Sequence, residues 1–312
     1  MPRLKDLKVR LWELRYRLTH STFRTAWMAE RAMLLADPRR LRDPILVYQM
    51  GRVGSSAAIE SLRARYPGIG LYQPHWLSPE GLDRFEALNR ESFTTLRFPL
   101  ALLVRSRFLQ DQIARRAGFP WRIITAVRDP VARNLSWFFT EMQWRHRDGN
   151  PLALYRSGER EAALRELQRL FEEDFEQEAP VQWFDRELKA TFGLDVLAHE
   201  FDPARGYQIY QDGGTRVLLY RLESLGECGE GAFAEFLGVD SFTLLRTNSI
   251  QDKSYGEIHQ AFVSRVRLHD DVLDRLYDSP VMRHFYTPAE IDRFRGKWRP
   301  ERVLATAVTA AH

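Results

Sequence analysis

The sequence predicts an α/β fold of three layers, in which a central parallel sheet is flanked by helices and an amphipathic helix is added at the N-terminus. Short apolar runs alternate along the chain with segments of helical periodicity, which is the pattern of a parallel sheet with helices on its faces. Two of these runs end in polar turns that lead directly into a helical segment. Regularly spaced leucines near the start predict the added helix.

The first 43 residues differ in character from the rest. Leucine recurs there at alternating steps of three and four, which places one stripe on a helix: Leu4, Leu7, Leu11, Leu14 and Leu18. Of 46 basic and 42 acidic side chains in the chain, this segment carries 11 and 5, so the remainder carries 35 and 37 and does not suit a nucleic-acid-binding body. We expect the stripe to pack on the body, to join two copies in a homo-oligomer, or to make peripheral contact with an acidic membrane surface.

Length and composition are those of a globular protein. The 312 residues, 44% of them hydrophobic, suffice for one large domain or two small ones. We expect a leader over residues 1–43, a main domain over 44–300 and a tail over 301–312. No run approaches the roughly 18 apolar residues of a membrane span, and no apolar secretory core is present, which predicts a cytoplasmic protein. Cys228 is the single cysteine and has no partner for an internal disulfide.

Apolar runs and helical patterns predict the order of elements within the main domain. The expected strands are Ile45–Tyr48, Gly70–Tyr72, Leu100–Val104, Ile123–Val127 and Val217–Tyr220. Helical patterns occupy the segments between them. The longest is Glu159–Glu178, where Leu164, Leu167, Phe171 and Phe175 share one face.

A glycine-containing loop, Gly51–Ser56, follows the first predicted strand and precedes the helical stretch Ala57–Arg65. Glycines permit a tight turn, the amide groups at a helix start point into it, and the helix dipole adds partial positive charge, so the pattern predicts an anion site. Arg52 adds a guanidinium, and Ser55 and Ser56 add hydroxyls. Glycine and serine at such a turn also serve as simple helix caps, and this alternative stays open.

A second site is predicted where another strand ends. Arg128 follows the run Arg122–Val127, at the carboxyl end where ligands bind in open α/β sheets. Asp129 suits the N-cap and Pro130 the first position of the helix that follows. Ser136 lies two turns further along that helix, so a guanidinium and a hydroxyl are expected to meet a second phosphate there. The alternative is a surface ion pair for Arg128 and a neutral helix position for Ser136.

Together the two motifs resemble those of sulfotransferases that use 3'-phosphoadenosine 5'-phosphosulfate (PAPS), which have a P-loop-like fold. That family's 5'-phosphosulfate loop is matched by Arg52-Val53-Gly54-Ser55-Ser56, and its 3'-phosphate element by Arg128, Asp129, Pro130 and Ser136. A third segment, from Val217 to Gly238, resembles a later strand and helix of the family. The resemblance implies that these residues bind PAPS, with Arg52 also stabilising charge on the leaving phosphate. Two positions depart from the cytosolic members, which carry tryptophan and tyrosine where Ala57 and Leu222 stand here.

Within that superfamily the sequence is similar to bacterial sulfotransferases assigned to capsular polysaccharide synthesis. The shared segments are Leu71–Ser78, Trp183 through Tyr207, and His284 to Trp298. This resemblance implies a carbohydrate acceptor, and it places a histidine at the end of the second predicted strand. We therefore expect His75 to be the general base that takes the proton of the acceptor hydroxyl. A loop histidine with only a hydrogen-bonding role is the alternative.

Further residues and other classes of protein complete the hypotheses. Lys253 lies in a polar segment where sulfotransferases close over the nucleotide, so it is expected either to reach a phosphate or to be a surface charge. No histidine spacing suggests a metal site. An ATP-dependent small-molecule kinase would require magnesium and a Gly-Lys-Ser/Thr loop, but Ser55 follows Gly54 where lysine would stand. A non-catalytic scaffold would not require two separate phosphate sites.

Overall fold

The computed structural model describes residues 42–89, 97–144, 150–245 and 255–299. They belong to two compact units. The sheet unit lies within Met1–Arg128 and Gln182–Asn248, and the helical unit lies within Asp129–Val181 and Ser249–His312. The predicted leucine stripe, Lys253 and the C-terminal tail lie outside the described residues.

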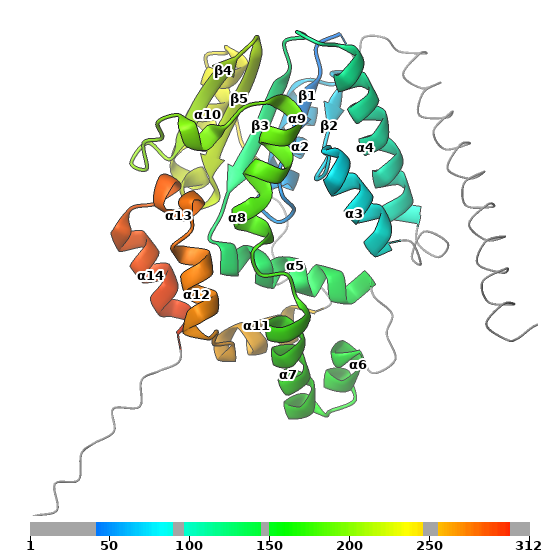
Figure 1. The fold of residues 1–312 in the computed structure, drawn as a ribbon, viewed down its shortest axis with the longest axis vertical. Coiled ribbons are helices and arrows are strands. Elements are labelled where there is room, and N and C mark those ends of the chain that lie inside the picture. The colour runs from blue at the N-terminus through cyan, green and yellow to red at the C-terminus, as the bar shows by residue number, and fades with distance from the viewer. Residues whose placement is uncertain (1–41, 90–96, 145–149, 246–254, 300–312) are drawn as a thin grey trace, which may run out of the picture. The chain divides into compact units, whose positions relative to one another are not determined.

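The sheet unit is built on a five-stranded sheet of order β2-β1-β3-β5-β4 (Figure 1). Its strands are β1 (Ile45–Val47), β2 (Leu71–Tyr72), β3 (Arg122–Val127), β4 (Tyr207–Asp212) and β5 (Thr215–Arg221). Four of them, β2, β1, β3 and β5, run parallel, and these are four of the predicted strands. The predicted α/β class with a central sheet is thus confirmed.

The fifth strand, β4, pairs antiparallel with β5 at one edge and was not predicted. Asp212 and Thr215 pair directly across a two-residue turn, Gly213-Gly214, whose φ angles are 52° and 91°. Two positive φ angles are what a tight hairpin turn requires, and glycine adopts them at little cost. The Gly-Gly pair was therefore the available signal, but β4 itself lacks a continuous apolar run because it lies at the edge.

The alternation of side chains defines two faces of the sheet. The register aligns Val47 of β1, through β3, with Leu218 of β5. Tyr48 follows Val47 by one residue, whereas Tyr220 follows Leu218 by two. Because successive strand residues point to opposite faces, these two tyrosines lie on opposite sides of the sheet.

Helices cover both faces. Tyr220 packs against Phe233 of α10 (Leu225–Leu237), with ring centroids 5.9 Å apart. On the other face, Tyr48 contacts Trp183 and Phe192 at 4.9 and 5.9 Å, where η4 (Phe184–Lys189) and α9 (Ala190–Phe192) run. These contacts confirm the predicted three layers within the sheet unit.

One predicted strand is wrong, because Leu100–Val104 lies inside α4 (Arg97–Arg115). Leu103, Val104 and Phe108 are buried at helical spacing. A short apolar run is compatible with a strand or with a buried helix, and its periodicity alone does not separate them. Here α4 packs against α3 (Pro79–Asn89), and Arg107 on α4 forms ion pairs with Asp83 and Glu86 on α3.

The helical unit consists of short helices. Their bounds are α5 (Pro130–Trp144), α6 (Pro151–Arg156), α7 (Arg160–Arg169), η3 (Leu170–Asp174), α11 (Gly256–Arg265), α12 (Asp270–Tyr277), α13 (Pro280–Phe285) and α14 (Pro288–Trp298). The helix expected over Glu159–Glu178 ends early, because α7 passes into the wider turn η3 and Phe175 is extended. The Gln177 side chain donates to the carbonyl of Phe171, which satisfies an acceptor at this helix end.

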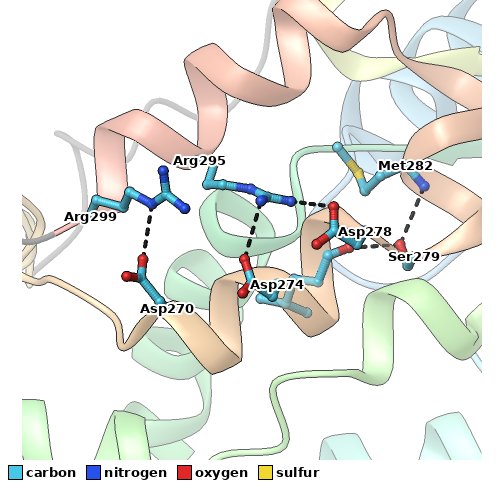
Figure 2. Close-up of polar contacts among 8 residues, drawn as sticks. Asp270, Asp274, Asp278, Ser279, Met282, Arg295 and Arg299 are labelled. Atoms are coloured by element: carbon cyan, nitrogen blue, oxygen red, sulfur yellow. Dashed lines mark hydrogen bonds and ion pairs between the residues drawn. The ribbon is translucent and has the colours of Figure 1, made fainter.

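Ion pairs join α12 to α14, as Figure 2 shows. Arg295 contacts Asp274 and Asp278, and Arg299 contacts Asp270. The three aspartates recur every four residues and so lie on one face of α12. Arg295 is largely buried, so its two contacts lie in a less screened environment than an exposed pair.

The remaining short elements are α2 (Ser55–Arg65), η5 (Val196–Ala198), η6 (Leu222–Ser224) and α8 (Ala179–Trp183), which contains the boundary of the two units. Among the described residues, no helix has both the length and the apolar character needed to cross a bilayer.

Candidate functional site

The loop after β1 has an unusual backbone. Arg52 has a φ of 76°, and in the described part of the chain it is the one non-glycine residue with positive φ. Gly54 follows in the same left-handed region, with φ 88° and ψ 14°. For a residue with a Cβ this conformation costs about 1 to 2 kcal/mol, so the loop holds Arg52 against its backbone preference. Strain of this kind clusters at binding sites.

Gly54 is required by its surroundings as well as by its φ angle. A Cβ at this position would approach Leu222 Cδ1 to 2.8 Å and Tyr220 Oη to 3.7 Å. Leu222 therefore packs directly against the loop. Any larger residue in place of Gly54 would thus crowd the Leu222 side chain.

The loop leads into the N-terminus of α2, whose N-cap is Gly54. In the described structure no side chain caps this helix, and its first turn has no acidic residue. Ser55 is buried and Ser56 is half-buried. Uncapped amide groups with the positive end of the helix dipole, flanked by hydroxyls, form an environment that favours an anion.

Arg128 is joined to this loop. It follows the last residue of β3, as the sequence predicts, and its Nη1 donates to the carbonyl of Arg52 at 2.8 Å. This bond supports the left-handed residue and fixes one nitrogen of a guanidinium that has five N–H donors. The Arg128 guanidinium therefore lies against the backbone of Arg52 at the carboxyl end of the parallel strands.

His75 is joined to the same loop. Its Nδ1 lies 2.8 Å from the carbonyl oxygen of Gln49, one residue past Tyr48. Because a carbonyl only accepts, Nδ1 carries the hydrogen, and the lone pair of the neutral imidazole is on Nε2. The ring also makes an edge contact with Trp76, which stacks on Phe85. The imidazole is thus held in the tautomer that can accept a proton through Nε2.

Polar groups beneath the loop are buried. Both amide atoms of the Gln49 side chain and the hydroxyl of Tyr220 are buried without a well-formed hydrogen bond, although these two side chains interact with each other. Burial raises the pKa of Tyr220 well above its ordinary value. An unsatisfied buried polar group costs about 1 to 3 kcal/mol. Such groups next to the loop Gly51–Ser56 therefore fit a site in which a bound ligand supplies the missing hydrogen bonds.

A buried carboxylate lies near His75 and was not predicted. Glu187 of η4 accepts hydrogen bonds from Tyr48 Oη, from the amides of Leu77 and Ser78, and from Ser78 Oγ. Burial raises its pKa, and these hydrogen bonds oppose the shift. Burial and the neighbouring negative charge also raise the pKa of Tyr48. Sequence reasoning missed Glu187 because 112 positions separate it from His75, and one acidic residue in a charged segment carries no signal of its own.

The other predicted residues lie in three settings. The side chain of Val53 is buried in the core, so this residue can meet a ligand only through its backbone. Ser136 is buried on α5 of the helical unit. Lys253 lies outside the described residues. The phosphate roles of these residues stay predictions, as do those of Arg52, Ser55, Ser56 and Arg128.

Asp129, which precedes α5, has a defined structural role. Its Oδ1 accepts from the amide of Val131 at 3.1 Å and from Tyr277 Oη at 2.7 Å, and its Oδ2 accepts from Trp298 Nε1 at 3.4 Å. The predicted helix start is thereby confirmed. The Asp129 carboxylate also joins the start of α5 to α12 and α14, the two helices whose ion pairs Figure 2 shows. These helices therefore fix the position of Asp129, which follows Arg128 in the chain.

A protein-family model matches part of the chain. Residues 161–287 match the model of a family described as "Putative capsular polysaccharide synthesis protein". The match includes Glu187 and Trp183, but it begins after Arg52, His75 and Arg128. Comparison with curated proteins and with solved structures gave no match.

Proposed function

We propose that this protein is a PAPS-dependent sulfotransferase that transfers the sulfuryl group to a hydroxyl of a carbohydrate. One observation carries the proposal: the loop after β1 joins two arginines to a histidine whose tautomer is defined. Arg128 is bonded to Arg52 and His75 to Gln49 through backbone carbonyls of that single loop. A phosphate-type site and a proton acceptor are the two parts that in-line sulfuryl transfer requires.

The donor would be held by the residues that the family resemblance indicates. Arg52, Ser55, Ser56 and the amides at the start of α2 suit the 5'-phosphosulfate, since they offer charge, hydroxyls and the helix dipole. Arg128 with Ser136 is proposed for the 3'-phosphate, and Lys253 for a phosphate contact. The buried side-chain amide of Gln49, which makes no well-formed hydrogen bond, fits a site that a ligand or its water completes.

PAPS supplies the sulfuryl group and a leaving phosphate. In the proposed reaction, Nε2 of His75 accepts the proton of the acceptor hydroxyl while Nδ1 keeps its hydrogen bond to Gln49. Arg52 and the α2 amides stabilise negative charge near the loop. The carbohydrate acceptor is inferred from the family that matches residues 161–287.

A thermal-shift panel tests the donor class. The unfolding temperature is measured with adenosine 3',5'-bisphosphate (PAP), with ATP and magnesium, and with buffer. Stabilisation by PAP alone is expected, since a ligand that binds only the folded state raises its stability by about 2.7 kcal/mol at a hundredfold excess over Kd.

Two variants separate the loop from general charge effects. Arg52→Ala is expected to abolish the PAP shift, whereas Arg63→Ala, at an exposed position late in α2, is expected to keep it. Stabilisation by magnesium ATP in place of PAP would favour the kinase hypothesis, and a PAP shift that survives Arg52→Ala would remove the loop from the site.

A further inference from the structure

The loop that carries His75 is held on one side by hydrogen bonds to a single helical turn. Trp183 and Glu187 are four residues apart and so lie on the same face of the chain where α8 passes into η4. Trp183 Nε1 donates to the carbonyl of His75 at 3.1 Å. Glu187 Oε2 accepts from the amides of Leu77 and Ser78 at 2.8 and 3.0 Å. The backbone is therefore held at His75 and again two residues later.

Glu187 also contacts the end of the first strand, β1, just before the loop Gly51–Ser56. Its Oε2 accepts from Tyr48 Oη, and Tyr48 immediately precedes Gln49, the residue whose carbonyl bonds His75. The Glu187 carboxylate is thus bonded both to the segment that follows His75 and to the residue that precedes Gln49. Because Glu187 is 2% exposed, water does not compete for these bonds.

The surroundings are shaped to admit this carboxylate. A Cβ on Gly81 would lie 1.7 Å from Glu187 Oε1, so only glycine at that position leaves the carboxylate its place. The Gly81 amide in turn donates to Ser78 Oγ, which donates to Glu187. A buried carboxyl group that accepts this many hydrogen bonds is costly to assemble, and truncating it leaves several donors unpaired.

We propose that Glu187, together with Trp183, is a positioning element for His75 that fixes both its backbone and, through Tyr48 and Gln49, the tautomer of its imidazole. The proposal rests on the proposed function, in which His75 is the base. Glu187 does not contact the reacting atoms; it acts through the histidine. It is distinct from a general stabiliser because its effect is expected to disappear when His75 is absent.

The geometric part is tested without any activity. Proteins with ¹⁵N-labelled histidine are compared by NMR, and His75→Ala assigns the His75 signals among the 8 histidines. The wild type is expected to show His75 as the Nδ1–H tautomer. Glu187→Ala is expected to convert it to a mixture of tautomers, whereas Asp185→Ala, at an exposed position on the same turn, leaves it unchanged. A single Nδ1–H tautomer in a folded Glu187→Ala protein would overturn the proposal.

Two milder variants cover the case in which Glu187→Ala does not fold. Trp183→Phe keeps a ring against Tyr48 but removes the donor to the His75 carbonyl. Glu187→Gln keeps the shape, and its carbonyl oxygen can still accept from the amides of Leu77 and Ser78 while Ser78 Oγ turns to accept from the new amide group. We expect a partial tautomer mixture in Trp183→Phe and the wild-type tautomer in Glu187→Gln. An unchanged tautomer in Trp183→Phe would contradict the proposal even if Glu187→Ala does not fold.

The catalytic part is tested by a double-mutant cycle with a sulfate acceptor. Glu187→Ala is expected to lower kcat about 10- to 100-fold with little change in the affinity for PAP, since a shift of about 1 Å in a catalytic group is worth up to 100-fold. In the His75→Ala background the same substitution is expected to have no further effect. Multiplicative losses would show that Glu187 is only structural.

Different results would disprove the proposed function and the proposed role of Glu187. If His75→Ala retains full turnover, His75 is not the base and the proposed mechanism fails. The tautomer experiment still decides whether Glu187 positions His75, because it requires neither donor nor acceptor.

Discussion

Arg52 combines the charge expected to bind phosphate with a backbone conformation that arginine resists, and two substitutions separate these effects. Arg52→Ala and Arg52→Gly both remove the guanidinium, but only alanine retains the left-handed strain at φ 76°. Relief of that strain is worth about 1 to 2 kcal/mol, and glycine gives back about 0.4 to 1 kcal/mol through the greater freedom of its unfolded chain. Arg52→Gly is therefore expected to be more stable than Arg52→Ala by about 1 kcal/mol.

Urea unfolding of both variants measures this difference, and calorimetry with PAP measures the loss of binding. We expect both to lose PAP affinity to a similar extent, because the missing charge is common to them. Arg128 loses no partner in either, since its acceptor is the carbonyl of residue 52. Equal stabilities would show that the left-handed conformation stores no strain. PAP binding at wild-type strength in either variant would refute the role of Arg52 in the site.

Three further predictions address the base, the buried carboxylate and the start of α5. His75→Ala should lower kcat by on the order of 10² to 10⁴ with the PAP affinity nearly unchanged, and turnover close to wild type would contradict this. The raised pKa of Glu187 means that this carboxyl group keeps its proton to a higher pH in the folded state than in the unfolded state. The free energy of unfolding of the wild type, measured against that of Glu187→Gln, should therefore fall as pH rises from the ordinary carboxyl range through the raised pKa. A difference that rises with pH would contradict this prediction. Tyr277→Phe should destabilise the protein by about 2 kcal/mol in urea unfolding because Asp129 loses a buried donor, and an unchanged midpoint would contradict it.

The sequence predicted those parts of the fold in which local pattern and tertiary environment agree. The runs at Ile45 and Ile123 are buried on both faces, so they are almost entirely apolar, and the turns that follow them contain the glycine or proline that their geometry requires. Leu103 and its neighbours are buried too, but in a helix, and four or five apolar letters do not separate these two environments. Edge strand β4 is half-exposed and carries too little apolar character to be recognised.

The candidate site was predictable only where its residues lie in a motif. Arg52 and Arg128 each follow a recognisable strand, and the structure brings them within one hydrogen bond. Glu187 and Trp183 contact the His75 segment from more than 100 positions away in the chain, and only the folded chain brings them there. Gln49 lies one residue past the predicted strand Ile45–Tyr48 and carried no signal of its own, yet its carbonyl bonds His75 and its side-chain amide is buried.

Calorimetric titration of the wild-type protein with PAP and with AMP tests the central claim most directly. The two nucleotides differ in the 3'-phosphate, for which Arg128 and Ser136 are proposed, and charge-assisted hydrogen bonds to it are worth about 1.5 to 3 kcal/mol each. Affinity for PAP is expected to exceed affinity for AMP by at least tenfold, which corresponds to about 1.4 kcal/mol. Equal affinities, or a preference for PAP that persists in Arg128→Ala, would contradict the account.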